Sequence, residues 1–178
     1  SPGDLISGLR YSYYEGAWST LPDFSRISSL KKGTLTDFSI SPRNRDENFG
    51  FVFEGFIKID AAGSYTFYTT SDDGSKLYIN GSEVVNNDGL HSARERSGSI
   101  NLTSGYHSIR VEFFERSGRE VLQVRYSGPG IGKQIIPDSN LFLEKGEDQP
   151  STQPDDPNPD SPGDLISGLR YSYYEGAW

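Results

Sequence analysis

The chain has 178 residues, a formal net charge of −8, and neither cysteine nor methionine. This length is enough for one domain with a hydrophobic core and an additional segment. The negative charge argues against a nucleic-acid-binding surface, and the absence of cysteine excludes disulfide bonds and thiol catalysis. The sequence has no run of about 18 apolar residues, so we expect no membrane span.

The first part of the chain predicts one strand between irregular segments. Residues 1–7 are small and polar, and we interpret them as the end of a linker. Residues 9–14 form the first expected strand, and Trp18 is expected to anchor the core. Residues 21–30 predict one short helical turn, and residues 35–38 have weak strand character.

The longest predicted strand covers residues 49–59, where large apolar side chains alternate with other residues. Gly55 lies in the middle of the apolar row, and Val52 and Glu54 belong to the opposite face. Since one face of such a strand packs against the core, we expect the apolar row to point inward. The members of this row are Phe49, Phe51, Phe53, Ile57 and Ile59.

The remaining strands are short and separated by turns that contain glycine. Asn80-Gly81 predicts a type I′ hairpin turn, because both central residues of that turn need positive φ. At least seven short strands in this arrangement predict an all-β fold, an antiparallel β-sandwich. The later strands are expected at residues 95–102, 106–114, 121–126 and 135–142.

Two adjacent aspartates, Asp72 and Asp73, lie in the turn between two predicted strands. Adjacent carboxylates repel each other unless a cation or hydrogen-bond donors lie between them. Two carboxylates and nearby loop carbonyls offer the hard oxygen ligands that Ca²⁺ prefers. The alternative is a plain turn in which Asp72 bonds to nearby backbone amides. Asn87 and Asp88 are either further ligands or simple turn formers, and the turn is favoured.

A linker and a sequence repeat follow the predicted domain of residues 1–145. Residues 146–163 carry five prolines and five acidic residues, a composition that cannot bury a core. Residues 161–178 then repeat residues 1–18 without a change. We interpret residues 164–178 as the start of a further identical unit in a tandem array, with a cloning artefact as the alternative.

The segment around the aspartate pair resembles the PA14 domain. The resemblance is carried by TSDDGSKLYING at residues 70–81, by the flanking segments 63–68 and 84–91, and by GYHSIRVEFFE at residues 105–115. It covers residues 8–143 and implies a PA14-type β-sandwich. In sugar-binding members of this family, two consecutive aspartates joined by a cis peptide hold a calcium ion that binds glycan hydroxyls.

The resemblance also implies a second loop that completes the site, here residues 115–120. This loop lacks the asparagine that yeast adhesins place there, which leaves the sugar specificity open. Glu115 and Glu120 are possible additional carboxylate ligands. The expected Ca²⁺ ligands are Asp72, Asp73, Ser117 and Gly118. The expected carbohydrate contacts are Asp72, Asp73, Arg116 and Ser117.

The sequence therefore predicts a non-enzymatic repeat unit of a large extracellular bacterial adhesin or surface filament. Its expected cofactor is Ca²⁺, and its expected partners are glycans and neighbouring repeats of the same protein. Residues 161–178 are expected to pack into or against a neighbouring unit. The alternatives are a purely structural spacer and an accessory module of a secreted glycosidase.

Overall fold

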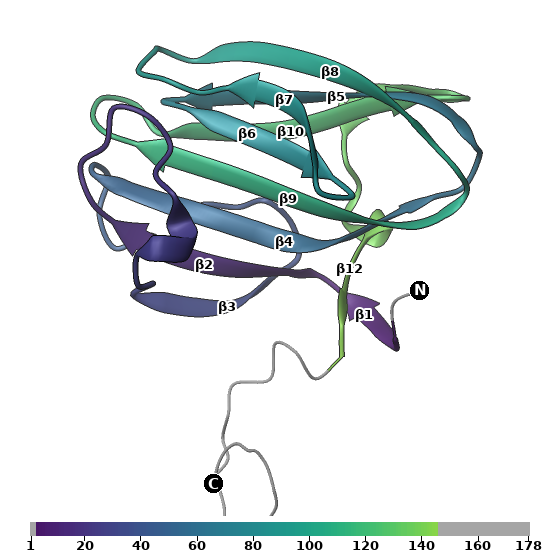
Figure 1. The fold of residues 1–178 in the computed structure, drawn as a ribbon, viewed down its shortest axis with the longest axis horizontal. Helices are drawn as coiled ribbons and strands as arrows, with labels where there is room; N and C mark the ends of the chain where they lie inside the picture. The colour runs from purple at the N-terminus through teal and green to yellow at the C-terminus, as the bar shows by residue number, and fades with distance from the viewer. Residues whose placement is uncertain (1–2, 146–178) are drawn as a thin grey trace, which may run out of the picture. The chain divides into compact units, whose positions relative to one another are not determined.

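The computed structural model describes residues 3–145, which form two antiparallel β-sheets packed face to face (Figure 1). The large sheet has the order β1 (Leu5–Ser7), β12 (Leu141–Glu144), β4 (Phe49–Ile59), β9 (Gly105–Glu115), β6 (Ser75–Ile79) and β7 (Ser82–Asn87). In the same sheet, β2 (Leu9–Glu15) pairs with β4 and with β3 (Lys31–Leu35). The small sheet has the order β11 (Ile131–Ile135), β10 (Val121–Gly128), β5 (Gly63–Asp72) and β8 (Arg94–Leu102).

The predicted all-β sandwich is confirmed. The described residues also contain two short 3-10 helices. They are η1 (Phe24–Arg26), within the segment expected to hold a helical turn, and η2 (Asp138–Asn140). The predicted linker at residues 146–163 and the start of a further unit at residues 164–178 lie outside the described residues.

The core lies between the two sheets and consists largely of aromatic side chains. The row predicted on β4 is buried as expected, with each member at most 2% exposed. Tyr65 and Phe67 of β5 and Tyr126 of β10 belong to the same cluster, and they come from the opposite sheet. Because every large inward side chain of β4 meets this cluster, the position and register of β4 are well determined.

The outer side of β4 is partly covered by the segment that follows β2. Val52 is buried from this side against Tyr14 and Phe24, and Trp18 and Leu21 pack on the same small cluster. Trp18 is only half-buried, and it packs on this outer cluster instead of the main core. The prediction that Trp18 anchors the core was therefore wrong. The alternation that identifies β4 as a strand cannot show that a loop covers its outer face.

The hairpin between β6 and β7 has the predicted turn. Asn80 and Gly81 both have positive φ, 52° and 83°, and Ile79 lies across from Ser82. This hairpin extends the large sheet beyond β9 and places the start of β6 directly after the aspartate pair.

Residues 5–7 form strand β1, so their interpretation as linker was wrong. Leu5 pairs with Glu144, and the amide of Lys145 donates to the carbonyl of Asp4 at 2.8 Å. The side chains of β1 remain largely exposed, so this strand is held by backbone pairing with β12. Its sequence therefore has no buried alternation that could reveal it.

Candidate functional site

The aspartate pair lies at the end of β5, where the chain turns into β6. Asp72 is the last residue of β5, its peptide bond to Asp73 is cis, and β6 begins at Ser75. Both aspartates are buried, with 7% and 6% of their surface exposed. Buried carboxylates need a compensating partner, so this turn is a candidate site rather than a solvated loop.

Glu115 joins the aspartates from the end of β9. It lies across from Phe49, its side chain is 0% exposed, and neither carboxylate oxygen has a hydrogen-bond partner among the described residues. One carboxylate oxygen from each of Asp72, Asp73 and Glu115 lies within 4.8 Å of the other two. We call these three residues the carboxylate cluster. A buried carboxylate without donors fits a bound cation, which supplies the missing positive charge.

The electrostatics of the cluster favour protonation when no cation is present. Burial, followed by the charges of Asp73 and Asp72, raises the pKa of Glu115 to about 9. Burial and then the charge of Asp73 also raise the pKa of Asp72. A divalent cation would reverse this effect, because it stabilises the ionised carboxylates that repel each other without it.

Asp73 is held in place by two backbone amides from different loops. The amide of His91 donates to one carboxylate oxygen at 3.2 Å, and the amide of Arg116 donates to the other at 2.8 Å. The amide of Asp73 itself donates to the carbonyl of Phe114 at 3.2 Å. These bonds fix the orientation of the carboxylate, and each oxygen has a remaining lone pair for a cation.

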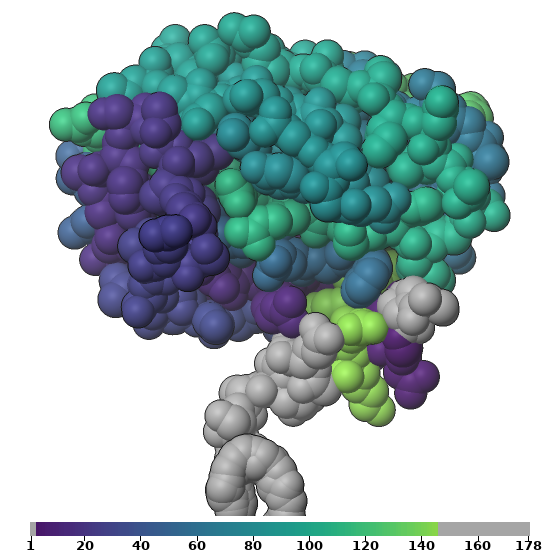
Figure 2. Space-filling view, in the orientation of Figure 1, coloured from purple at the N-terminus to yellow at the C-terminus, as the bar shows by residue number. Residues whose placement is uncertain are grey.

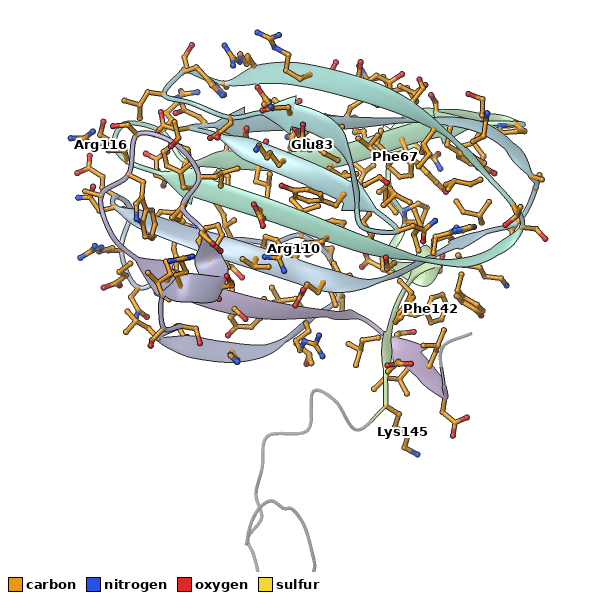
Figure 3. All side chains as sticks on the ribbon, in the orientation of Figure 1. Phe67, Glu83, Arg110, Arg116, Phe142 and Lys145 are labelled. Carbon is orange, nitrogen blue, oxygen red and sulfur yellow. The ribbon has the colours of Figure 1, made fainter. Side chains whose placement is uncertain are left out.

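The predicted second loop, which joins β9 to β10, lies beside the cluster. In the structure, Glu115 is the last residue of β9, and the loop begins at Arg116. Arg116 donates its amide to Asp73 and projects its side chain at the end of the sandwich, where it donates to the Ser19 hydroxyl at 3.0 Å (Figure 3). Ser117 and Gly118 are exposed, and their expected roles as cation and sugar ligands stay predictions.

The sequence left Asn87, Asp88, Glu115 and Glu120 open as possible further ligands. Of these four, the structure places the Glu115 carboxylate with those of the aspartates, and the other three side chains have partners of their own. Glu120 pairs with Arg43 at 3.2 Å, and Asp88 accepts the amide of Leu21 at 2.9 Å. Asn87 is buried in a polar network beneath the site. The sequence signal for Glu115 is its position two residues after the inward Phe113, which places it on the same face of β9 at the strand end. Glu120 in the loop that follows offered the same carboxylate chemistry, so the sequence did not distinguish the two.

A separate hollow lies on the outer face of the large sheet. It has a volume of about 610 Å³, and side chains of β9 lie at its floor (Figure 2). Arg110 in this floor is paired with Glu54 at 2.6 Å and with Glu112 at 2.9 Å. Arg10 also pairs with Glu54, at 3.5 Å, so two arginines meet two glutamates in this hollow. These charged side chains are paired, whereas the Glu115 carboxylate is not.

Comparison with protein families identifies the fold that surrounds this cluster. The PA14 domain model matches residues 6–140. This chain belongs to the PA14 domain family. The match includes the aspartate pair, Glu115 and the loop that follows Glu115, so the whole candidate site lies within the PA14 domain.

Two curated relatives contain a segment similar to this PA14 domain. Anti-sigma-I factor RsgI3 of Acetivibrio thermocellus is 28% identical over 177 residues, which is 96% of this chain and 25% of the relative. Alpha-agarase of Thalassotalea agarivorans is 30% identical over 116 residues, 65% of this chain and 7% of the relative. The chain thus spans a quarter or less of the length of each of these two relatives.

Solved structures show the same fold at low sequence identity. The PA14 domain of the MpAFP antifreeze protein has a TM-score of 0.68 at 21% identity, covering 85% of this chain and 97% of that one. A PA14 sugar-binding domain from an RTX adhesin has a TM-score of 0.64 at 18% identity, covering 78% of this chain and 99% of that one. The Epithelial Adhesin 9 A domain of Candida glabrata, in complex with Galβ1-4GlcNAc, has a TM-score of 0.63 at 14% identity. The similarity covers 83% of this chain and 95% of that one.

Within residues 3–145, no helix is long and apolar enough to cross a membrane.

Proposed function

We propose that this PA14 domain is a non-enzymatic carbohydrate-binding unit that uses Ca²⁺ at the carboxylate cluster. The observation that carries the proposal is the buried Glu115 carboxylate, which has no donor and lies with two further carboxylates. Ca²⁺ takes six to eight oxygen ligands, so the cluster would supply only some of them. Loop carbonyls at Ser117 and Gly118 and the hydroxyls of a glycan are suited to supply others.

The sugar-binding part of the proposal is supported by two kinds of similarity. An adhesin domain with the same fold is described as sugar-binding, and another is in complex with a galactose-containing disaccharide. Two alpha-agarases contain segments 28–30% identical to this chain. A bound cation would contribute a charge that polarises and orients glycan hydroxyls, and Arg116 and Ser117 are placed on the loop beside it.

A binding role fits the described side chains better than a catalytic role. Both histidines are engaged in loop structure: His91 lies 2.8 Å from the carbonyls of Asn87 and Ser92, and His107 lies 2.8 Å from the carbonyl of Thr103. The sequence has no cysteine nucleophile. We therefore propose that the unit binds its glycan without chemical change.

We further propose that the unit is repeated in a large extracellular or cell-surface protein. The unchanged repeat of 18 residues supports this, and so does the match with RsgI3, which covers 96% of the chain and so continues past residue 145. The same match favours a second candidate, in which the unit is the glycan-binding part of a regulatory protein of the anti-sigma-factor type.

The experiment that tests the proposal is calcium titration with and without sugar. We expect Ca²⁺ to bind with a dissociation constant of about 10⁻³ M or lower and to raise the melting temperature by mass action. Asp73→Ala should abolish the rise. Equal melting curves in millimolar Ca²⁺ and in chelator would rule out the cation site.

Sugar binding is tested separately with Galβ1-4GlcNAc and with agarose-derived oligosaccharides. Binding should require Ca²⁺ and disappear in chelator, because the cation is expected to contact the sugar directly. Binding that survives chelation would contradict the proposed role of the cluster, because the sugar would then bind without the cation.

A further inference from the structure

The loop of residues 88–93 connects β7 to β8 and supplies one of the two amides that hold Asp73. The residues on either side of this loop are Asn87, the last of β7, and Arg94, the first of β8. The loop itself is short of apolar anchors, since Leu90 is 52% exposed. Its position must therefore be set mainly by hydrogen bonds.

Asn87 holds the strands and the Arg94 side chain on which the loop rests, from a fully buried side chain. Its amide nitrogen donates to the carbonyl of Thr69 at 3.1 Å and to the carbonyl of Arg94 at 3.0 Å. Its amide oxygen accepts from the Arg94 guanidinium at 2.9 Å. A single side chain thus joins β5, β7 and β8 directly beneath the aspartate pair, and a buried network of this kind fixes one arrangement of its members.

The same network continues into the loop. The Arg94 guanidinium also donates to the carbonyl of Asp88 at 3.3 Å, and the His91 ring lies 2.8 Å from the carbonyl of Asn87. The loop is therefore held at its first residue and at its middle. The amide that His91 donates to Asp73 is positioned by contacts that begin at Asn87.

Backbone contact connects this loop tightly to the aspartate turn. A Cβ atom added to Gly74 would lie 2.8 Å from the amide nitrogen of Gly89 and 2.6 Å from the Phe114 ring. The turn and the loop therefore pack against each other with no space for a side chain. Any displacement of the loop would be transmitted directly to Asp73.

We propose that Asn87 is the positioning residue of the carboxylate cluster: it sets the loop whose His91 amide orients Asp73 toward the cation. This inference rests on the proposed Ca²⁺ site. Residues that orient the ligands of a metal typically change its affinity by about 10- to 100-fold when they are mutated. We expect a loss of that size for Asn87, although the residue would not contact the cation itself.

The test compares Asn87→Ala and Asn87→Asp with the unchanged chain. Asn87→Ala removes every bond of the side chain. Asn87→Asp keeps an acceptor for Arg94 and removes the bonds donated to Thr69, Ser71 and the carbonyl of Arg94, but it also adds a buried negative charge, so Asn87→Ala is the primary variant. Ca²⁺ affinity is measured by calorimetry, and the exchange rate of the His91 amide hydrogen is measured by NMR in chelator. We expect affinity to fall about 10- to 100-fold, with faster exchange at His91.

Two controls separate positioning from a general loss of stability. Ile57→Val lowers the stability of the core away from the site, and Asn140→Ala removes another side-chain bond to a backbone carbonyl, that of Lys58 at 3.1 Å. Both should leave Ca²⁺ affinity and His91 exchange unchanged. If Asn87→Ala does not fold, Arg94→Gln removes the bonds to Asn87 and Asp88 from a less buried position and should give the same two effects.

The outcomes distinguish the inference from the proposed function. Unchanged Ca²⁺ affinity and unchanged His91 exchange in the Asn87 variants, with only a lower melting temperature, would overturn the positioning role. If the unchanged chain itself binds no Ca²⁺, the proposed site is wrong, and His91 exchange still decides whether Asn87 sets the loop.

Discussion

Glu115 is the residue on which the chemistry of the site depends most. Without a cation, folding must keep a buried carboxyl group next to two aspartates, which holds its pKa at about 9 against an ordinary value of 4.5. At a pH between these two values, Glu115 is protonated in the folded state and ionised in the unfolded state. This contribution to stability is fully present below pH 4.5 and is lost as the pH rises towards 9.

Glu115→Gln should accordingly stabilise the chain in chelator at neutral pH, because the amide needs no protonation. We expect a gain of more than about 1 kcal/mol, or roughly 4 °C in melting temperature. At pH 4.5 the two proteins should melt alike. The same variant should lose the stabilisation by Ca²⁺. A variant that is less stable than the unchanged chain in chelator at pH 7.5 would contradict the unpaired state of Glu115.

Proton release provides a second test at the same residue. Since Ca²⁺ requires ionised ligands and the pKa of Glu115 lies above neutrality, binding at pH 7 should release close to one proton. Calorimetry in buffers of different ionisation enthalpy measures this number directly. Affinity should also increase from pH 6 to pH 9. Binding without proton release would place the cation away from Glu115.

At the level of strands, the sequence predicted what depends on local alternation and turn chemistry. The inward row of β4 and the Asn80-Gly81 turn are found as expected, because each is determined by residues close in the chain. Strand β1 was missed because it is held by backbone pairing to a strand more than 100 residues away. The aspartate pair could be identified from its neighbours, whereas its association with Glu115 depends on the alignment of β5, β6 and β9.

Gly55 shows how a sequence irregularity reports a contact between strands. A glycine inside an otherwise regular strand indicates close approach of another backbone. A Cβ atom at Gly55 would lie 2.5 Å from the carbonyl oxygen of Phe142 in β12 and 2.8 Å from the Leu9 side chain. Gly55→Ala should therefore separate β12 from β4 and destabilise the domain by about 2 kcal/mol or more.

Urea unfolding measures this loss, with Gly132→Ala as the matched control. An added Cβ at Gly132 meets nothing within 4 Å, so that substitution should change stability by no more than about 0.5 kcal/mol. Equal effects of the two substitutions would mean that β12 can shift without cost.

For the whole domain, the chain connections and the candidate site lie apart. Leu5 and Glu144 are cross-strand neighbours, so the chain enters and leaves the sandwich at one place. In β4, Phe49 lies beside Glu115 and Ile57 lies beside Leu141, and the eight steps between them span about 26 Å. In Figure 3, Arg116 and Lys145 lie at opposite ends of the drawn domain. The residues at which the chain enters and leaves therefore do not cover the site.

This separation predicts multivalent binding if the unit is repeated. A chain extended to two complete copies should dissociate from a surface densely coated with glycan at least about 100-fold more slowly than the single unit, because the second site rebinds at high effective concentration. Galβ1-4GlcNAc and agarose surfaces in Ca²⁺ are the probes. Asp73→Ala in one copy should restore the single-unit rate, and sparse coating should remove the difference. If the single unit binds but the two-copy chain dissociates equally fast on the dense surface, the two sites cannot engage one surface together.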